Sequence, residues 1–281
     1  MYKDKRIPSC NPRKLTSKDI AEYVTYRRAN GILDTTINKD ISLLRMLLKW
    51  IGNDAVERYK AEYGTTKPLS FSERQPPLDN DVIEKVYDLA RSTQDYRILQ
   101  GCVAVILGTA CGLRPQESRQ LYVYDVRLDG INSSIYVRHV KGEGKWGEPR
   151  PTPVMDGVED IIGKYLEFRA RKLEEFHKES DALFPPLRSD REFMAQQSFG
   201  KVKVLVEEQV GAKFQLRAGR RAFGQRALDS GQELKNVSVT MGHASVVTTQ
   251  RYYANYRQDD ALNAMLSFKN AAGNRSAGGR V

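Results

Sequence analysis

Histidine and cysteine are both scarce in this chain, whose 281 residues include only three of each. Cys10, Cys102 and Cys111 lack the spacing of metal ligands, and no histidine lies near a cysteine in the sequence. We therefore expect no metal site and no cofactor bound through one. Cys102 and Cys111 fall in an apolar segment, where buried free thiols are common, so the sequence indicates a reducing, cytoplasmic compartment.

Long hydrophobic runs are also absent. No apolar run approaches the ~18 residues that a membrane helix needs. The first residues, MYKDKRIPSCNPRK, contain no apolar stretch typical of a signal peptide. We therefore expect no membrane association.

Acidic side chains are outnumbered by basic ones. The chain has 35 Asp and Glu against 45 Lys and Arg, and its net charge is +10 at pH 7. An excess of positive charge of this size favours a polyanionic partner, and nucleic acid is the first candidate. The alternative is a basic protein whose charge serves only solubility.

The N-terminal part predicts a small helical unit. Capping signals and glycine stops delimit helices from Thr16 to Gly31, from Asp34 to Gly52 and from Asp54 to Tyr63. A segment with three prolines and no hydrophobic periodicity follows over 65–78 and is typical of a linker. A unit of so few residues buries little hydrophobic core. We therefore expect residues 1–64 to be stabilised by contacts with the second domain, a partner chain or DNA. The sequence leaves open whether this N-terminal domain is complete.

The second part predicts a larger unit with mixed structure. The helix expected over 96–111 is apolar all round and should lie at the centre of the core. Strand patterns appear over 135–140 and 146–154, and the prolines of the second suit only an edge strand. Further helices are expected at about 79–92, 157–179, 190–209, 218–228, 233–241, 246–253 and 259–268, and a disordered tail over 271–281. The fold class is therefore mainly α with a small antiparallel β-sheet (α+β).

Two features early in the larger unit could carry chemistry. Arg114 lies between a helix stop at Gly112 and a helix start at Pro115. An arginine there is costly to desolvate without a partner, which could be Glu117 in a structural pair or a phosphate. Lys141, with Lys145, lies in a glycine-rich turn that leaves the backbone free to approach a ligand, although most such lysines are simply solvated.

Two further features lie near the C-terminus. Arg217 and Arg220 are three residues apart, so they share a helical face and would repel each other unless an anion lies between them. The alternative is a solvated basic face. His243 then precedes the adjacent tyrosines Tyr252 and Tyr253, which cannot both face one core because neighbours on a helix point about 100° apart.

In this order and spacing, the features resemble the tyrosine recombinases, the Xer and phage-integrase family. The pattern consists of GLRPQES over 112–118, a lysine on a glycine-rich hairpin, a basic-x-x-Arg box, and a Gly-His pair with a tyrosine nine residues after the histidine. The resemblance covers roughly 78–268 and implies a catalytic domain over 79–270. More weakly, it implies a helical core-binding domain over 1–64, which binds DNA.

The resemblance assigns roles to these positions. Tyr252 matches the nucleophile, and Tyr253 would pack beside it. Arg114 and Arg220 would hold the non-bridging oxygens of the scissile phosphate, and Lys141 would protonate the departing 5′-oxygen. His243 would hydrogen-bond the phosphate or the tyrosine, and Glu117 would orient Arg114.

One position departs from the family pattern, whose H-x-x-R box usually begins with histidine. We align Arg217 with that histidine because Phe223 then falls at a buried position three residues after Arg220. Under the rival alignment, Arg217 itself grips the phosphate. Some archaeal and viral integrases resemble this chain in carrying a basic residue there. Because the pKa of arginine exceeds 12, Arg217 would stabilise a phenolate rather than act as a base.

The resemblance implies a site-specific DNA recombinase that breaks and rejoins double-stranded DNA through a 3′-phosphotyrosyl bond. The bond conserves energy, so no cofactor is needed. Four protomers would assemble on two sites, from monomers or dimers in the free state, in the cytoplasm beside the nucleoid. The alternatives are nicking and resealing like that of a type IB topoisomerase, and a non-catalytic DNA-binding protein of the same fold.

Overall fold

The computed structural model describes residues 11–64 and 75–243. The chain divides into two compact units, Met1–Arg74 and Gln75–Val281. Tyr252, Tyr253, the helices expected over 246–253 and 259–268, Cys10 and the expected tail over 271–281 lie outside the described residues. The helical content with one small antiparallel sheet confirms the predicted fold class.

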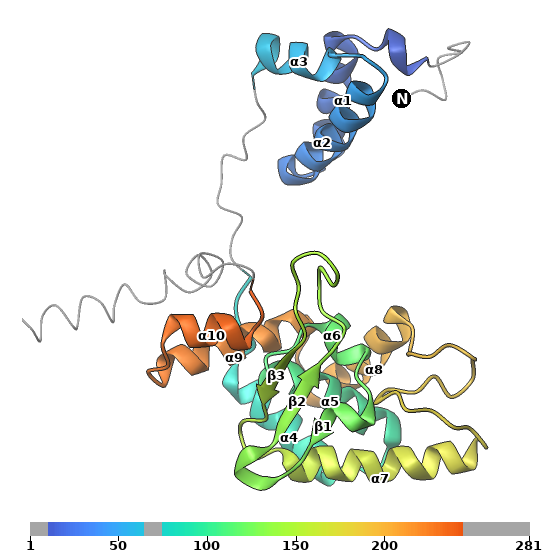
Figure 1. Cartoon of the computed structure of the whole chain (residues 1–281), viewed down its shortest axis with the longest axis vertical. Helices are drawn as coiled ribbons and strands as arrows, with labels where there is room; N and C mark the ends of the chain where they lie inside the picture. Colours follow the sequence, from blue (N-terminus) through green and yellow to red (C-terminus); the bar gives the residue numbers. More distant parts are fainter. Residues whose placement is uncertain (1–10, 65–74, 244–281) are drawn as a thin grey trace, which may run out of the picture. The chain divides into compact units, whose positions relative to one another are not determined.

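The small unit consists of a short 3-10 turn and three helices (Figure 1). Thr16 caps the first helix, since its hydroxyl accepts from Asp19 N at 3.3 Å while the Asp19 carboxylate accepts from Thr16 N at 2.9 Å. On the second helix, Ile37, Ile41 and Leu48 form a buried stripe. The elements are η1 (Pro12–Lys14), α1 (Ser17–Ala29), α2 (Asp34–Trp50) and α3 (Ala55–Tyr63).

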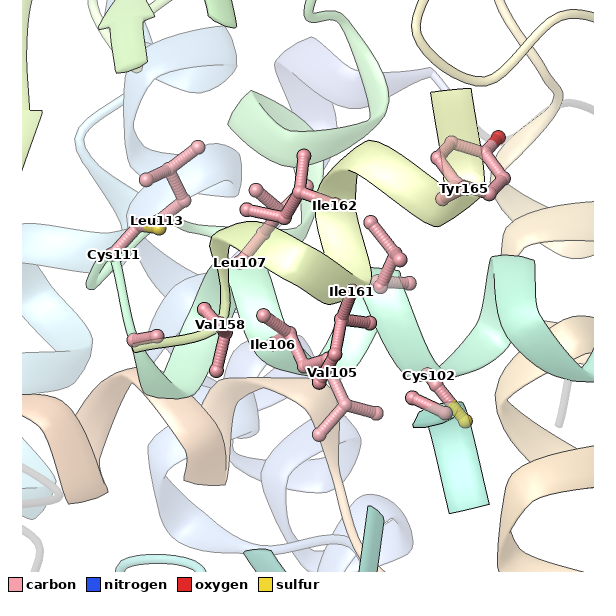
Figure 2. Packing of buried hydrophobic residues seen from close by; sticks show 14 of the residues in the cluster. Cys102, Val105, Ile106, Leu107, Cys111, Leu113, Val158, Ile161, Ile162 and Tyr165 are labelled. Atoms are coloured by element: carbon pink, nitrogen blue, oxygen red, sulfur yellow. The ribbon is translucent and has the colours of Figure 1, made fainter. Parts of the chain in front are cut away.

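The larger unit is built around α5 (Tyr96–Thr109), as the apolar sequence predicts. Nearly every residue of α5 is buried. Figure 2 shows Val105, Ile106 and Leu107 of this helix packed with Ile161 and Ile162. The surrounding helices are α4 (Asn80–Ser92), α7 (Glu159–Glu175), α8 (Gln196–Val210) and α9 (Leu216–Asp229); α6 (Pro115–Arg119) and α10 (Leu234–Thr240) are short. Among the described residues no helix is long and apolar enough to cross a membrane.

The sheet has three antiparallel strands in the order β1-β2-β3, with η2 (Val123–Asp125) and η3 (Gly130–Asn132) beside it. The strands are β1 (Val126–Arg127), β2 (Ser134–Val137) and β3 (Arg150–Pro153). β3 is an edge strand, as its prolines predict. The two-residue β1 is too short to be recognised in the sequence.

Three predicted boundaries are wrong, two because of a local turn and one because of a tertiary contact. The return strand begins at Arg150 rather than 146, because Trp146 closes a turn by donating to Gly142 O at 3.0 Å. The first strand ends at Val137, where this loop begins. The helix expected from residue 190 begins at Gln196, because the preceding segment is held irregular, for example by Arg119 Nη1 donating to Met194 O at 2.7 Å.

Candidate functional site

A buried carboxylate, Glu117, organises the site. The turn after α5 ends at Gly112, and Pro115 starts α6, which places Glu117 at the third helical position. There its side chain accepts from Arg114 N at 2.9 Å and so caps the helix that carries it. Its side chain is 1% exposed. A carboxylate this deeply buried requires positive partners.

Three arginines surround this carboxylate. Arg114 Nη1 lies 2.6 Å from Glu117 Oε1, Arg150 Nη2 lies 3.0 Å from Oε2, and Arg220 Nη1 lies 3.7 Å from Oε2. We call Glu117 and these three residues the arginine cluster. Three guanidinium charges against one carboxylate leave a net positive charge, which attracts an anion to the exposed side of the cluster.

Backbone carbonyls fix the guanidinium groups in place. Arg114 Nη2 donates to Gly242 O at 3.0 Å, and Arg150 Nε donates to Thr240 O at 2.9 Å. Arg220 donates to Gly112 O at 2.6 Å and also to Met241 O. The turn over 240–242 therefore receives a hydrogen bond from each of the three arginines. The fold assembles the cluster from three segments that are remote in the sequence, and the turn over 240–242 is a fourth.

The turn over 240–242 leads directly into His243, which is half-buried beside the cluster. Burial and the charges of Arg220, Arg114 and Arg150 lower the pKa of His243 to about 4. The imidazole is therefore neutral at pH 7. Burial would raise the pKa of Glu117, but the three arginine charges outweigh it and hold that pKa below its ordinary value, so the carboxylate stays ionised.

Lys141 lies on the loop between β2 and β3. The loop stands out from the body of the larger unit (Figure 1), and Gly142 and Gly144 take positive φ values within it. Lys141 is exposed, and its side chain makes no hydrogen bond or ion pair with any residue that the structure describes. The structure thus places this lysine where a ligand can reach it.

The two arginines of α9 have different surroundings, which the sequence did not anticipate. Arg220 is buried in the cluster, whereas Arg217, in the first turn of the helix, is exposed. The two arginines thus differ in burial, and their joint action on one anion stays a prediction. Phe223 is buried, as predicted, and its ring lies so close to Gly112 that a Cβ there would approach it to 2.6 Å.

Arg150 is the residue that sequence reasoning missed. A signal existed: side chains alternate along a strand, so Arg150 shares the face of Thr152, while Pro151 and Pro153 are exposed on the other. Thr152 is buried, and an arginine on a buried face must have a partner. Nothing in the sequence could show that this partner is Glu117, 33 residues away.

Among residues 11–64 and 75–243, no group of His, Cys, Asp and Glu could hold a metal ion.

Comparisons with known proteins agree on one family. A family model described as the phage integrase family matches residues 77–259. The tyrosine recombinase XerD of Listeria monocytogenes is 22% identical over 253 residues, which are 89% of this chain and 82% of that protein. The tyrosine recombinase XerA of Pyrococcus furiosus is 26% identical over 240 residues, which are 84% of this chain and 76% of that protein.

Two solved structures share the fold. The Tn1549 transposon integrase in complex with circular intermediate DNA has a TM-score of 0.66 and 20% identity over 93% of this chain and 88% of that one. The XerH site-specific recombinase bound to its difH substrate has a TM-score of 0.63 and 19% identity over 89% of this chain and 72% of that one.

Proposed function

Because the chain belongs to the phage integrase family, we propose that it breaks and rejoins double-stranded DNA with Tyr252 as the nucleophile. It is a site-specific tyrosine recombinase, and its relatives favour this function over a type IB topoisomerase or a non-catalytic DNA-binding protein. The observation that carries the proposal is the net positive charge of the arginine cluster, held beside His243.

The reaction begins with attack by the Tyr252 hydroxyl on a DNA phosphodiester. A phosphotyrosyl bond to the 3′ end forms, the bond to the 5′-oxygen breaks, and Lys141 gives that oxygen its proton. The 5′-hydroxyl of a second strand then attacks the phosphotyrosyl bond and releases the tyrosine. The number of phosphoester bonds is conserved, so the reaction needs no nucleotide cofactor.

The cluster stabilises the pentavalent transition state. Arg114 and Arg220 bind the non-bridging oxygens, and each charged hydrogen bond is worth about 1.5–3 kcal/mol. Glu117 orients Arg114 through the 2.6 Å contact. A bound phosphate offsets the arginine charges that lower the pKa of His243, so the imidazole becomes a better acceptor for the Tyr252 proton when DNA is present. The exposed Arg217 assists electrostatically, in place of the usual histidine.

The two units divide the work on DNA. The helical unit over 1–64 acts as a core-binding domain, 65–78 as the linker, and 79–270 as the catalytic domain, with 271–281 as a tail. Four protomers assemble on two recombination sites, from monomers or dimers in the free state. An apolar stripe on α2 supports such contacts, since Leu43, Met46, Leu47 and Trp50 recur at helical spacing and are exposed. Because its substrate is DNA, we expect the enzyme in the cytoplasm beside the nucleoid.

The test is formation of a covalent protein–DNA adduct on radiolabelled DNA that carries the cognate site. We expect an adduct from the native chain and from Tyr253→Phe, and none from Tyr252→Phe, which should still bind DNA. An adduct that depends on Tyr253 alone would show that the nucleophile is misassigned. Exchange of strands between two labelled duplexes separates recombination from resealing of one strand.

A further inference from the structure

Arg150 bridges two parts of the site. Its Nη2 and Nη1 lie 3.0 and 3.5 Å from the two carboxylate oxygens of Glu117, and its Nε donates to Thr240 O at 2.9 Å. The side chain is only 11% exposed. Its contacts are thus to the carboxylate that holds Arg114 and to the turn that leads into His243.

Gly242 shows how tightly this bridge is packed. A Cβ at this position would lie 2.6 Å from Cζ and Nη1 of Arg150, and the backbone φ is +61°. Any side chain here would therefore be strained and would also displace the guanidinium group. The glycine before His243 is required both for the turn and for the arginine packed against it.

Arg150 also ends the loop that carries Lys141. It opens β3 and pairs with Val137, the last residue of β2, so the loop departs from and returns to this point. A side chain that holds Glu117 and the turn over 240–242 therefore also anchors the return of the lysine loop. Three components of the site depend on one residue.

We propose that Arg150 is a positioning residue for strand cleavage, which fixes His243 and the base of the Lys141 loop relative to Arg114 and Arg220. The inference rests on the proposed function. Arg150 acts through Glu117 and through the turn over 240–242, not by contact with the phosphate. Its planar guanidinium group directs two nitrogens at the carboxylate of Glu117 and a third at Thr240 O, a fixed arrangement that the single ammonium nitrogen of lysine does not reproduce.

The first experiment compares Arg150→Gln and Arg150→Lys in rate of adduct formation and in DNA affinity. We expect both to slow adduct formation about 10–100-fold, a range typical of supporting residues, and to leave the affinity within about threefold. A rate for Arg150→Lys equal to the native rate would overturn the proposal, since charge alone would then suffice. An affinity loss above about tenfold would overturn it in favour of direct phosphate contact.

The second experiment follows the His243 imidazole by NMR titration. The charged groups that face it are Arg220 on α9, Arg114 and Glu117 at α6, and Arg150 on β3. Loss of one positive charge in Arg150→Gln should raise the His243 pKa, whereas Arg150→Lys should leave it near the native value. An unchanged pKa in Arg150→Gln would contradict the proposed electrostatic influence of Arg150 on His243.

The third experiment is a double-mutant cycle with Gly242→Ala. In the native background, the alanine strains φ and displaces Arg150; in Arg150→Gln, only the strain remains, so its effect on the adduct rate should be smaller. Additive effects would contradict the proposed packing.

Arg169→Gln is the matched control. Arg169 is also buried and donates to Ala182 O at 2.9 Å, but it lies on α7, outside the arginine cluster. We expect this variant to be less stable, with the adduct rate per folded molecule and the His243 pKa unchanged. If the native chain itself forms no adduct, the proposed function fails. The His243 titration, and the same double-mutant cycle measured by the free energy of unfolding, would still test the contacts of Arg150 with Glu117 and the turn over 240–242.

Discussion

Arg114, Arg150 and Arg220 are fixed by Glu117 and by backbone carbonyls, whereas the Lys141 side chain contacts no described residue through a hydrogen bond or ion pair. The arginines are in place before any substrate arrives. The lysine lies on an exposed loop, and we expect contact with DNA to fix the position of its side chain. The difference matches their proposed tasks, because a charge that stabilises a transition state gains from a fixed position, and a proton donor must reach the leaving oxygen.

The largest effect that tests this contrast concerns Lys141. Lys141→Ala should slow cleavage about 10²–10⁴-fold, because the leaving 5′-oxygen loses its proton donor. A substrate with sulphur in place of that oxygen has a leaving group that needs no acid, so its cleavage should be nearly independent of Lys141. Lys145→Ala, on the same loop, is the control and should cleave both substrates at near-native rates. Equal losses on both substrates for Lys141→Ala would show that this lysine binds DNA instead.

The next effect concerns the carboxylate that holds the arginines. Glu117→Gln should destabilise the larger unit by about 3–5 kcal/mol, because the buried Arg220 and the partly buried Arg114 and Arg150 lose their counter-charge. Glu57→Gln in the small unit, which removes the exposed partner of Arg45, should cost at most about 1 kcal/mol. Hydrogen exchange of the α5 and α2 amides measures the two units separately.

The sign of the pH dependence sharpens this comparison. The folded pKa of Glu117 lies below its ordinary value of 4.5. Its ionised form therefore contributes stability above pH 4.5, which is lost as the pH falls through the folded pKa. The difference in free energy of unfolding between Glu117→Gln and the native chain should disappear as the pH falls from 4.5 through the folded pKa of Glu117. A difference that persists at lower pH would mean that the glutamine amide destabilises the fold by its shape rather than by its lack of charge.

A third prediction compares the buried and the exposed arginine of α9 by adduct formation. Arg220→Ala should lose about 10²–10³ in rate, because it removes a contact to the developing charge in a desolvated site. Arg217→Ala should lose less, and its defect should shrink as the pH rises, since hydroxide can then help to ionise Tyr252. Arg217→His should retain activity. Under the rival alignment the order of the rates reverses. Arg217→His then slows adduct formation nearly as much as Arg217→Ala, and Arg220→Ala has little effect.

The sequence by itself determined much of the architecture, because the patterns involved are local. The apolar run over 102–107 predicted the central helix, prolines predicted the edge strand, and the motif spacing identified the family. The capping signal at Thr16 and the burial of Phe223 are also local consequences of side-chain chemistry and helical period. Each of these features, apart from the order of the motifs between residues 112 and 252, can be recognised within a window of a few residues.

Only the tertiary structure decided how the site is put together. Both Arg217 and Arg220 have the charge and spacing of a phosphate ligand, yet only Arg220 reaches Glu117. The alternation along β3 indicated at most that Arg150 needs a partner, and only the structure shows that it joins Glu117 to the turn before His243. Which of many arginines meets one buried carboxylate depends on how distant segments pack around α5, and that long-range packing leaves no local pattern in the sequence.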